Sequence, residues 1–425
     1  MENFVLKGQI CYSVSPTEIK TIENGYIVCV DGKSRGVFEK LPSNYQNLTI
    51  KDFGDHLIIP GLTDAHVHAP QFEFRTLGMD LELLDWLNTH TFPTESKYAD
   101  VEYANQAYQQ FVKELVTTPN TRAIIFGTLH VPATITLMNQ LEASGHVTLV
   151  GKVNMDRNGF ETLEEENAGN SILKTVEWLE SIQGKYQRTM PIITPRFIPC
   201  CTDELTKRLG KLARKYKLPV QSHLSENLSE VTWVKELAPE SKFYGDAYDR
   251  LGLFDDDIQT IMAHCVWSSE EEIALMKDRN VFVAHCPSSN THLSSGIAPI
   301  RKFMNNGLNI ALGSDIAGGT HTSILRAMAD AIQVSKLYWR YIDQNDKPLT
   351  IEEAFYLGTI GGGSFFGKVG SFSEGYEFDA VVLGSDENIL PQRPELTLLE
   401  RLTRCIYLGD NQNVAAKFVR GQQIV

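Results

Sequence analysis

The alternation of apolar strands with helical stretches through the middle of the chain is the feature that most constrains its fold. Eight short apolar runs typical of buried strands recur between residues 57 and 315. They are Leu57–Val67, Ala123–Leu129, Val147–Val153, Pro191–Arg196, Pro219–His223, Thr260–His264, Val281–His285 and Ile310–Asp315. Helical patterns between or after them include Val101–Val116, Asn170–Gln183, Asp203–Tyr216, Glu270–Lys277 and Ser323–Tyr338. About eight such units predict an α/β fold, a (β/α)8 TIM-type barrel.

The two ends of the chain predict a second, smaller domain. Short β-type runs occur at Phe4–Cys11, Gly25–Asp31 and Leu48–Phe53, and again at Phe378–Leu383 and Ala415–Val425. Since chain termini often lie close in space, both ends can belong to one unit. We therefore expect residues 1–56 and 374–425 to form a small β-sandwich domain and residues 57–373 to form the barrel inserted between them.

Charge and cysteine usage limit the classes of partner and compartment. A formal net charge of −14 argues against a nucleic-acid partner, which needs many Lys and Arg side chains, and favours a small neutral substrate. The sequence contains no run of about 18 apolar residues, so we expect no membrane span, and the start of the chain lacks a signal-peptide pattern. Seven scattered cysteines without a C-x-x-C pair predict reduced thiols and a cytoplasmic location.

Polar residues gather where the predicted strands end. They are His66, His68, His130, Asp156, Arg196, His223, His264, His285 and Asp315. Most single histidines are structural, but several on successive strands of one barrel converge at its carboxyl-terminal face, where active sites of this fold lie. Cys265 and Cys286 each follow one of these histidines, and we interpret both as buried strand-end cysteines rather than catalytic thiols.

The sequence His66-Val67-His68 is the strongest local motif. On a strand, residues i and i+2 point to the same face, so both imidazoles can reach one metal ion while Val67 packs the other way. Imidazole is a good zinc ligand, and a catalytic zinc keeps one position open for water. Later strands end in Gln221–Glu226, Met262–Cys265 and Leu312–Asp315, which add further candidate ligands.

In order and spacing these residues resemble the amidohydrolase superfamily. His66 and His68 match its first-strand pair, His223 its fifth-strand ligand, His264 its sixth-strand histidine and Asp315 its eighth-strand aspartate. Arg196 stands where dinuclear members carry a carboxylated, bridging lysine, and a permanently protonated arginine cannot make that bridge. The resemblance therefore implies the mononuclear deaminase branch. It implies one Zn²⁺ per chain, with Fe²⁺ as the alternative metal, held by His66, His68, His223 and Asp315.

The same resemblance implies three catalytic residues. Asp315 would also accept a proton from the attacking water, and Glu226 would protonate a ring nitrogen of the substrate. His264 would hold the water or stabilise the tetrahedral intermediate, and whether it is also a metal ligand stays open. For Glu226 the alternative is a surface residue, because Ser225–Asn227 also fits the start of a helix.

Further motifs resemble one family in that branch, the guanine deaminases. They are His68–Phe72, Leu83–Asn88, Thr91–Glu95, Gly151–Asp156, Thr194–Phe197, His285–Asn290, Leu293–Gly296 and Tyr407–Asp410. The resemblance runs from about Pro60 to the end of the chain. It departs at Pro119–Arg122, where the family commonly has a glycine-containing turn, and at His292 and His321, which the family pattern does not require.

This resemblance implies zinc-dependent hydrolysis of guanine to xanthine and ammonia, with Gln71, Arg196 and Phe197 contacting the purine base. Arg196 has a planar fork of donors, Gln71 has both a donor and an acceptor, and Phe197 has a flat apolar face. The structural alternatives are an ion pair for Arg196, a plain loop position for Gln71 and ordinary core for Phe197. Trp86 fits either a pocket wall or helix packing.

Two other functions remain to be tested. The same chemistry on another aminopurine or related ring, such as 8-oxoguanine, keeps the metal site and changes the pocket. A catalytically silent scaffold would bind other proteins instead, although every expected metal ligand is present. The H-x-E and P-C-x-x-C signature of nucleic-acid deaminases is absent from the sequence. A homodimer is expected from the family resemblance alone.

Overall fold

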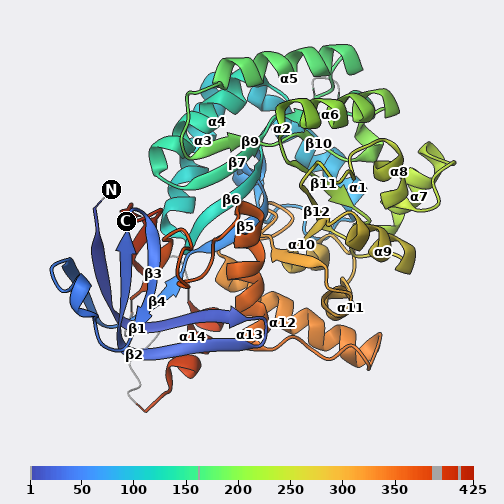
Figure 1. Cartoon of the computed structure of the whole chain (residues 1–425). Coiled ribbons are helices and arrows are strands. Elements are labelled where there is room, and N and C mark those ends of the chain that lie inside the picture. The colour runs from blue at the N-terminus through green and yellow to red at the C-terminus, as the bar shows by residue number, and fades with distance from the viewer. Residues whose placement is uncertain (1, 161–162, 385–394, 410–412) are drawn as a thin grey trace.

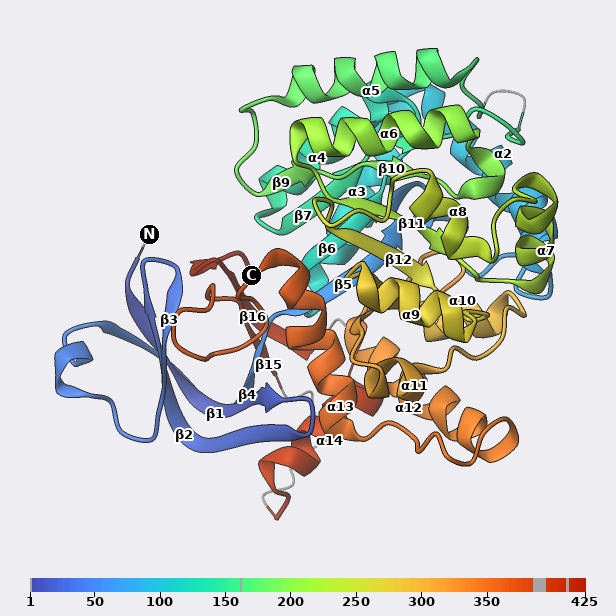
Figure 2. The same cartoon turned by 45° about the vertical axis from the view of Figure 1, so that its right-hand side comes forward.

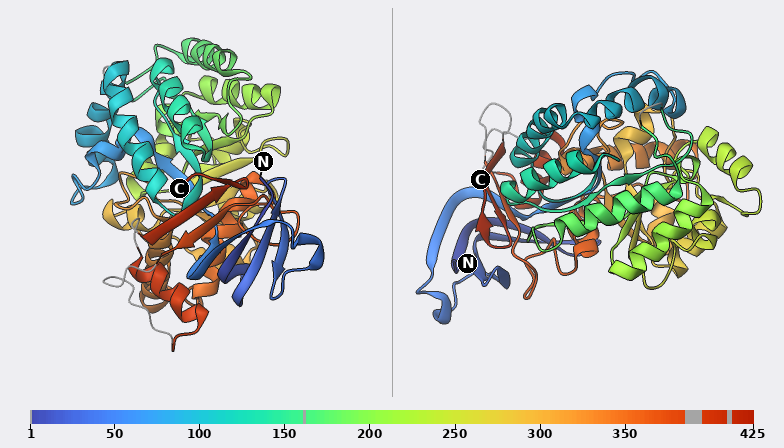
Figure 3. Two further views of the ribbon diagram at one scale, coloured as in Figure 1. Left: turned by 90° about the vertical axis from the view of Figure 1, so that its left-hand side faces the viewer. Right: turned by 90° about the horizontal axis from the view of Figure 1, so that it is seen from above.

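The computed structural model describes residues 2–160, 163–384, 395–409 and 413–425. A large part has parallel strands at its centre with helices around them, and a smaller part, mainly a β-sheet, lies against one side of it (Figures 1 and 2). Both chain termini lie on the side of the smaller part in every view (Figure 3). The Asp410 that ends one of the family motifs lies outside the described residues.

The central strands form two parallel four-stranded sheets. The first contains β5 (Leu62–His68), β6 (Asn120–Phe126), β7 (Val147–Gly151) and β9 (Thr189–Pro191) in that order. The second contains β11 (Val220–Leu224), β12 (Thr260–His264), β13 (Phe282–His285) and β14 (Asn309–Leu312), and β8 (Val153–Asn154) pairs separately with β10 (Thr194–Pro195).

Contacts at both edges connect these two sheets. A parallel bridge joins Ile193 to Val220 on one side. On the other side, the Asp315 N–H donates to the carbonyl of His66 at 2.8 Å, and the His68 N–H donates to that of Ile316 at 3.2 Å. The end of β14 therefore lies beside the end of β5.

Each predicted central strand coincides with observed strand residues, but three runs are divided. Leu57–Val67 is shared between β4 (Thr49–Pro60) and β5, Val147–Val153 between β7 and β8, and Pro191–Arg196 between β9 and β10. Two of the breaks fall beside prolines, Pro60 and Pro191, which lack the N–H that a continuous ladder requires. Apolar character thus predicts the strands and does not predict their interruptions.

Helices follow or separate the central strands. They are α3 (Val101–Thr117), α4 (Val131–Ser144), α5 (Ala168–Ile182), α6 (Asp203–Tyr216), α7 (Leu228–Leu237), α8 (Tyr244–Arg250), α9 (Glu270–Asp278), α10 (Pro287–His292), α11 (Ile300–Asn305), α12 (Ile324–Tyr341) and α13 (Ile351–Tyr356). The predicted helix Asp203–Tyr216 matches α6. Its N-cap Thr202 accepts from the Leu205 N–H, and acidic and basic side chains lie in its first and last turns.

A run of short helical turns follows β5 and covers the carboxyl ends of the strands. It contains η2 (Ala69–Phe74), α1 (Leu83–Trp86), η3 (Leu87–Thr91), α2 (Phe92–Glu95) and η4 (Ser96–Ala99). Trp86, Leu87 and Phe92 are buried, so this run is anchored by apolar side chains. It supplies one wall of the cavity described below.

The two ends of the chain meet in one seven-stranded sheet. Its order is β17 (Gln422–Gln423), β16 (Val414–Val419), β15 (Ala380–Leu383), β4, β1 (Phe4–Ser15), β2 (Glu18–Val30) and β3 (Lys33–Phe38). β4 runs parallel to β1 and antiparallel to β15, so it joins the N-terminal and C-terminal segments. An apolar cluster of its own, which includes Phe4, Phe378 and Phe418, packs against this sheet.

One helix of this region was not predicted. α14 (Leu398–Leu408) lies in the segment expected to be entirely β. Thr397 and Glu400 form a reciprocal capping box at its start, and its buried face carries Leu402 and Ile406. No helix in the described part of the chain is both long and apolar enough to cross a membrane.

The Pro119–Arg122 segment, where the sequence departs from the family pattern, starts β6 at the junction of the two parts. Thr121 Oγ1 donates to Asp379 Oδ2 at 3.0 Å, and Arg122 Nε donates to the same oxygen at 2.7 Å. Arg122 and Asp379 are both buried. These polar residues therefore connect the central strands to the small sheet and do not shape the cavity.

Candidate active site

The carboxyl ends of β5, β11 and β14 bring the four predicted metal ligands together. The Nε2 of His68 lies 3.2 Å from that of His66 and 3.1 Å from that of His223. Asp315 Oδ1 lies 3.2 Å from the Nε2 of His66 and 3.6 Å from that of His68. His66, His68 and Asp315 are buried, whereas His223 is half-buried.

The donor atoms of this cluster fit a metal ion. His223 Nδ1 lies 2.6 Å from the carbonyl oxygen of Arg196 and can only donate to it, which leaves a lone pair on Nε2. That lone pair lies opposite the Nε2 of His68. A cation bound between the two nitrogens would stabilise this arrangement. Ligands placed tetrahedrally about 2.0–2.1 Å from zinc would lie about 3.3–3.4 Å apart, close to the distances found here.

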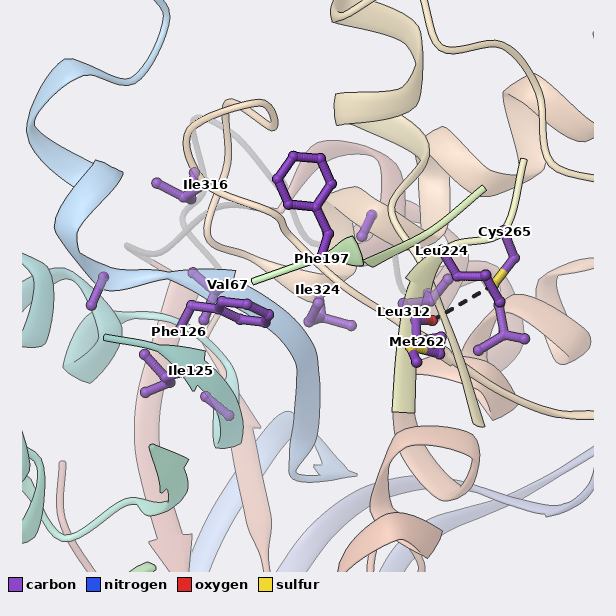
Figure 4. Close-up of a cluster of buried hydrophobic side chains, with 14 of the residues drawn as sticks. Val67, Ile125, Phe126, Phe197, Leu224, Met262, Cys265, Leu312, Ile316 and Ile324 are labelled. Atoms are coloured by element: carbon purple, nitrogen blue, oxygen red, sulfur yellow. Dashed lines mark hydrogen bonds between the residues drawn. The ribbon is translucent and has the colours of Figure 1, made fainter. Parts of the chain in front are cut away.

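Apolar side chains fix the orientation of these histidines. The ring of Phe126, at the end of β6, lies 4.5 Å from that of His68 and 5.0 Å from that of His66, measured between centroids. Figure 4 shows Phe126 beside Val67, and shows Leu224, Met262 and Leu312 from three other strand regions in the same buried cluster. Rigid packing around the donors holds them ready for an ion.

Asp315 is held on a strained turn just after β14. Its φ angle is +48°, and that of His264 is +75°, both in the region that residues other than glycine rarely adopt. Buried Asp64 supports this turn by accepting from the backbone N–H of Ser314 at 2.9 Å and from its hydroxyl at 2.5 Å. Burial alone would raise the pKa of Asp315, but the nearby histidines outweigh it and hold that pKa well below its usual value.

Glu226 and His264 face each other beside the four donors. His264 Nε2 lies 3.3 Å from Glu226 Oε2 and 3.7 Å from Asp315 Oδ2. Its Nδ1 lies 2.8 Å from Asn290 Oδ1, while Ser295 Oγ donates to Glu226 Oε1 at 3.3 Å. Sequence reasoning missed Asn290 and Ser295 as neighbours of the site, although both fall inside family motifs.

Glu226 is buried, which excludes the surface-residue alternative. Only 4% of the residue is exposed, and the following helix α7 is capped by Asn227 and Glu230 instead. Burial, and then the negative charge of Asp315, raise the pKa of Glu226 well above its usual value. The side chain is thus suited to carrying a proton near neutral pH.

His264 fits a metal ligand as well as a neighbour of the ligands. Donor atoms of His66, His223 and His264 lie within 4.8 Å of one another, as do those of His264, Cys286 and Asp315. Both interpretations of His264 stay open. Burial raises the pKa of Cys265 and of Cys286 well above the usual value, which agrees with unreactive, protonated thiols.

A second group of polar side chains forms one wall of the same cavity. Gln71 comes from η2 and Arg196 from the end of β10, and both are buried. Arg196 donates to both carboxylate oxygens of Glu95, at 2.6 and 3.1 Å. Gln71 Nε2 also donates to Glu95, at 2.8 Å, and Gln71 Oε1 accepts from the Ala317 N–H at 3.1 Å. Arg196 therefore forms an ion pair with Glu95, in agreement with the structural alternative for this residue, but the pair lies in the cavity wall.

A cavity of about 380 Å³, its mouth included, joins the two groups. Its lining consists of His68, Gln71, Leu83, Trp86, Leu87, Arg196, Phe197, His223, Glu226, His264, Leu293 and Asp315. Trp86 is thus a wall residue, which agrees with one of its two interpretations. Phe197, 4% exposed, presents its ring to this space and is drawn in Figure 4.

Several other polar residues predicted at strand ends do not line this cavity. Asp156 instead accepts from the N–H and the hydroxyl of Thr202 and so supports the start of α6. His130 precedes α4, and the buried ring of His285 has no hydrogen-bond partner among the described residues. His292 and His321, the unexpected histidines, also lie outside the lining.

Comparison with known proteins agrees with this architecture and site. The model of the amidohydrolase family matches residues 57–424. The chain therefore belongs to the amidohydrolase family, whose fold is of the TIM-barrel type.

Within that family, the matches group the chain with the guanine deaminases. It is 35% identical to guanine deaminase of Dictyostelium discoideum, over 99% of this chain and 98% of that protein. It is 32% identical to guanine deaminase of Escherichia coli (strain K12), over 96% and 92% of the two chains. A crystal structure of guanine deaminase from C. acetobutylicum with bound guanine in the active site superposes with a TM-score of 0.96, at 46% identity over both whole chains.

Proposed function

We propose that this protein catalyses the hydrolytic deamination of guanine, in which guanine and water give xanthine and ammonia. The observation that carries the proposal is the single cavity in which Gln71, Arg196 and Phe197 face the His–Asp cluster. Guanine has acceptors at O6 and N7, which match the donors of Arg196, and an amino group at C2. The likeness to a guanine deaminase with bound guanine supports the same substrate.

The metal in the proposal is one Zn²⁺ per chain, held by His66, His68, His223 and Asp315, with Fe²⁺ as the alternative. When bound, such an ion lowers the pKa of a coordinated water toward about 7 and so supplies a nucleophile at neutral pH. The distances between the donor atoms support this assignment.

The protein's own side chains perform the proton transfers. Asp315 accepts the proton of the attacking water, because its carboxylate lines the cavity beside the histidines. Glu226 donates a proton to the ring nitrogen next to the carbon under attack, and then assists the departure of ammonia. His264, 3.3 Å from Glu226, holds the attacking water or stabilises the tetrahedral intermediate. Phe197 packs against the purine, while Gln71 and Arg196 orient it.

The finer architecture is also a proposal. Residues 57–373 form a (β/α)8 barrel, supported by the contacts that join the two parallel sheets at Ile193–Val220 and Asp315–His66. Residues 1–56 and 374–425 form the small β-sandwich domain, supported by the sheet that both ends share. β4 carries the chain across the boundary proposed at residue 57.

The assembly is expected from the family resemblance, and the location is expected from the sequence. The proposal is a cytoplasmic homodimer that acts on a small purine and binds neither nucleic acid nor membrane. The net charge of −14 and the seven buried, unpaired cysteines are consistent with it.

The test is ammonia release and ultraviolet change with guanine, adenine, cytosine and 8-oxoguanine, on zinc-loaded protein. We expect rapid conversion of guanine to xanthine and little reaction of the other three bases. Turnover of 8-oxoguanine instead would keep the metal site and overturn the substrate. Turnover of none would leave the scaffold function as the better account.

A further inference from the structure

Glu95 is a buried carboxylate that no catalytic role explains. It lies at the end of α2, is 1% exposed, and does not line the cavity itself. Its carboxylate accepts hydrogen bonds from Arg196 and Gln71, and both of these side chains belong to the cavity wall. A charge buried so deeply is costly unless it is paired, so the arrangement of these three side chains is tightly determined.

The ion pair leaves the wall with no net charge. Arg196 carries one positive charge, Glu95 carries one negative charge, and the bidentate geometry brings them within 2.6 Å. Among the described residues, no second cation lies within ion-pair distance of Glu95. A ligand in the cavity therefore meets the hydrogen-bond donors of Arg196, while Glu95 neutralises the positive charge of its guanidinium.

Glu95 also fixes which atoms are presented to the ligand. Two of the five N–H groups of Arg196 point to Glu95, which leaves three for other acceptors. The amide of Gln71 is held in one orientation, because its nitrogen must face the carboxylate and its oxygen must face the Ala317 N–H. One hydrogen and one lone pair of that amide remain for a ligand.

We propose that Glu95 makes this cavity selective for uncharged purine bases, by neutralising Arg196 and by fixing the amide of Gln71. The inference rests on the proposed function and adds a consequence to it. Xanthine loses a proton more readily than guanine does, so a wall without net charge favours the substrate over its ionised product. Glu95 is thus a positioning and specificity-determining residue rather than a catalytic one.

The test compares two purines that share the O6 and N7 acceptors. At a mildly alkaline pH xanthine is largely ionised, whereas hypoxanthine is neutral. Binding of each to the metal-loaded wild type and to Glu95→Gln is measured by calorimetry, which needs no turnover. We expect Glu95→Gln to bind hypoxanthine at least about 10-fold more weakly and ionised xanthine at least about 10-fold more tightly, because the guanidinium is no longer neutralised.

Two further variants separate charge from fold. Glu95→Asp keeps the negative charge on a shorter side chain, so it should weaken both ligands and still disfavour ionised xanthine. Glu102→Gln, which removes an exposed acid at the start of α3, should bind both like the wild type. If Glu95→Gln does not fold, the ratio of the two affinities in Glu95→Asp decides: a ratio unchanged from wild type supports the inference, and a shift toward xanthine overturns it.

The outcomes also distinguish this inference from the proposed function. Guanine turnover by the wild type, with equal losses of both ligands in Glu95→Gln, would overturn the inference alone. Absence of turnover, with the predicted reversal of ligand preference, would overturn the proposed function and support the inference. A wild type that binds neither purine would overturn both.

Discussion

Glu226 and His223 lie in one cavity but have different proposed tasks, and substitution can separate them. Glu226→Gln keeps the size of the side chain and removes the transferable proton, so bound zinc should stay at one per chain while kcat falls by about 100- to 10,000-fold.

His223→Ala removes a donor that lies 3.1 Å from His68, so it should lose both the metal and turnover. Metal analysis and steady-state kinetics check both. Normal zinc and turnover in His223→Ala would refute the ligand assignment.

At the scale of single residues, the sequence reveals side chains that belong to a local pattern. His66 and His68 are two apart on a strand, and His223, His264 and Asp315 each end an apolar run. Glu95 has no such pattern, since its partner Arg196 is 101 positions away. Asn290 and Ser295 were likewise recognisable only as parts of motifs, because their contacts with His264 and Glu226 depend on how distant strands meet.

At the scale of elements, the site depends on how β14 is seated. Gly361, at the end of η6 (Leu357–Gly361), lies so close to the backbone oxygen of Ile310 in β14 that an added Cβ would collide with it. Gly361→Ala must therefore shift η6, β14 or both, and β14 leads directly to Asp315. We expect the free energy of unfolding to fall by about 1–3 kcal/mol and kcat to fall by about 100-fold.

The matched control for this prediction is Gly384→Ala, since the nearest atom to its added Cβ would be that of Ala415, at an ordinary 3.4 Å. Thermal unfolding and guanine turnover of both variants are the measurements. Equal behaviour of the two glycine variants would show that β14 tolerates the displacement and that Asp315 does not depend on it.

The same scale shows where sequence patterns are strong. Each of the eight apolar runs contains observed strand residues, and amphipathic spacing predicted α6 and nearly all of α3. Six-residue helices such as α10 and α13 are too short to show a period of 3.6, and they form only because tertiary contacts surround them. α14 was overlooked because its neighbourhood was expected to be β.

At the scale of the whole molecule, both chain ends were expected in one domain, and strands from both ends lie in the seven-stranded sheet. The contacts that attach this sheet to the central strands were not foreseen, because they join residues hundreds of positions apart. Lys417 of β16 is fully buried and donates to the carbonyl oxygens of Leu115, Thr118 and Asn120, at 3.2, 2.8 and 3.1 Å. One lysine of the small sheet thus provides the hydrogen-bond donor for carbonyl oxygens at the end of α3 and at the start of β6.

Lys417→Met keeps the length and apolar stem of this side chain and removes its donors. Several buried carbonyl oxygens would then lose their partner, so we expect the free energy of unfolding to fall by about 2–4 kcal/mol. Because Lys417 lies outside the cavity, kcat of the folded variant should stay within about twofold of wild type, since a distant packing change leaves the reacting groups in place. Lys7→Met, which breaks an exposed ion pair with Asp52, should change stability little.

Denaturant unfolding followed separately by fluorescence and by loss of turnover distinguishes two outcomes. Coincident transitions at lower denaturant would mean that the small sheet and the central strands unfold together and depend on this lysine, whereas an unchanged midpoint would mean that their other contacts, such as that of Arg122 with Asp379, hold them together without it.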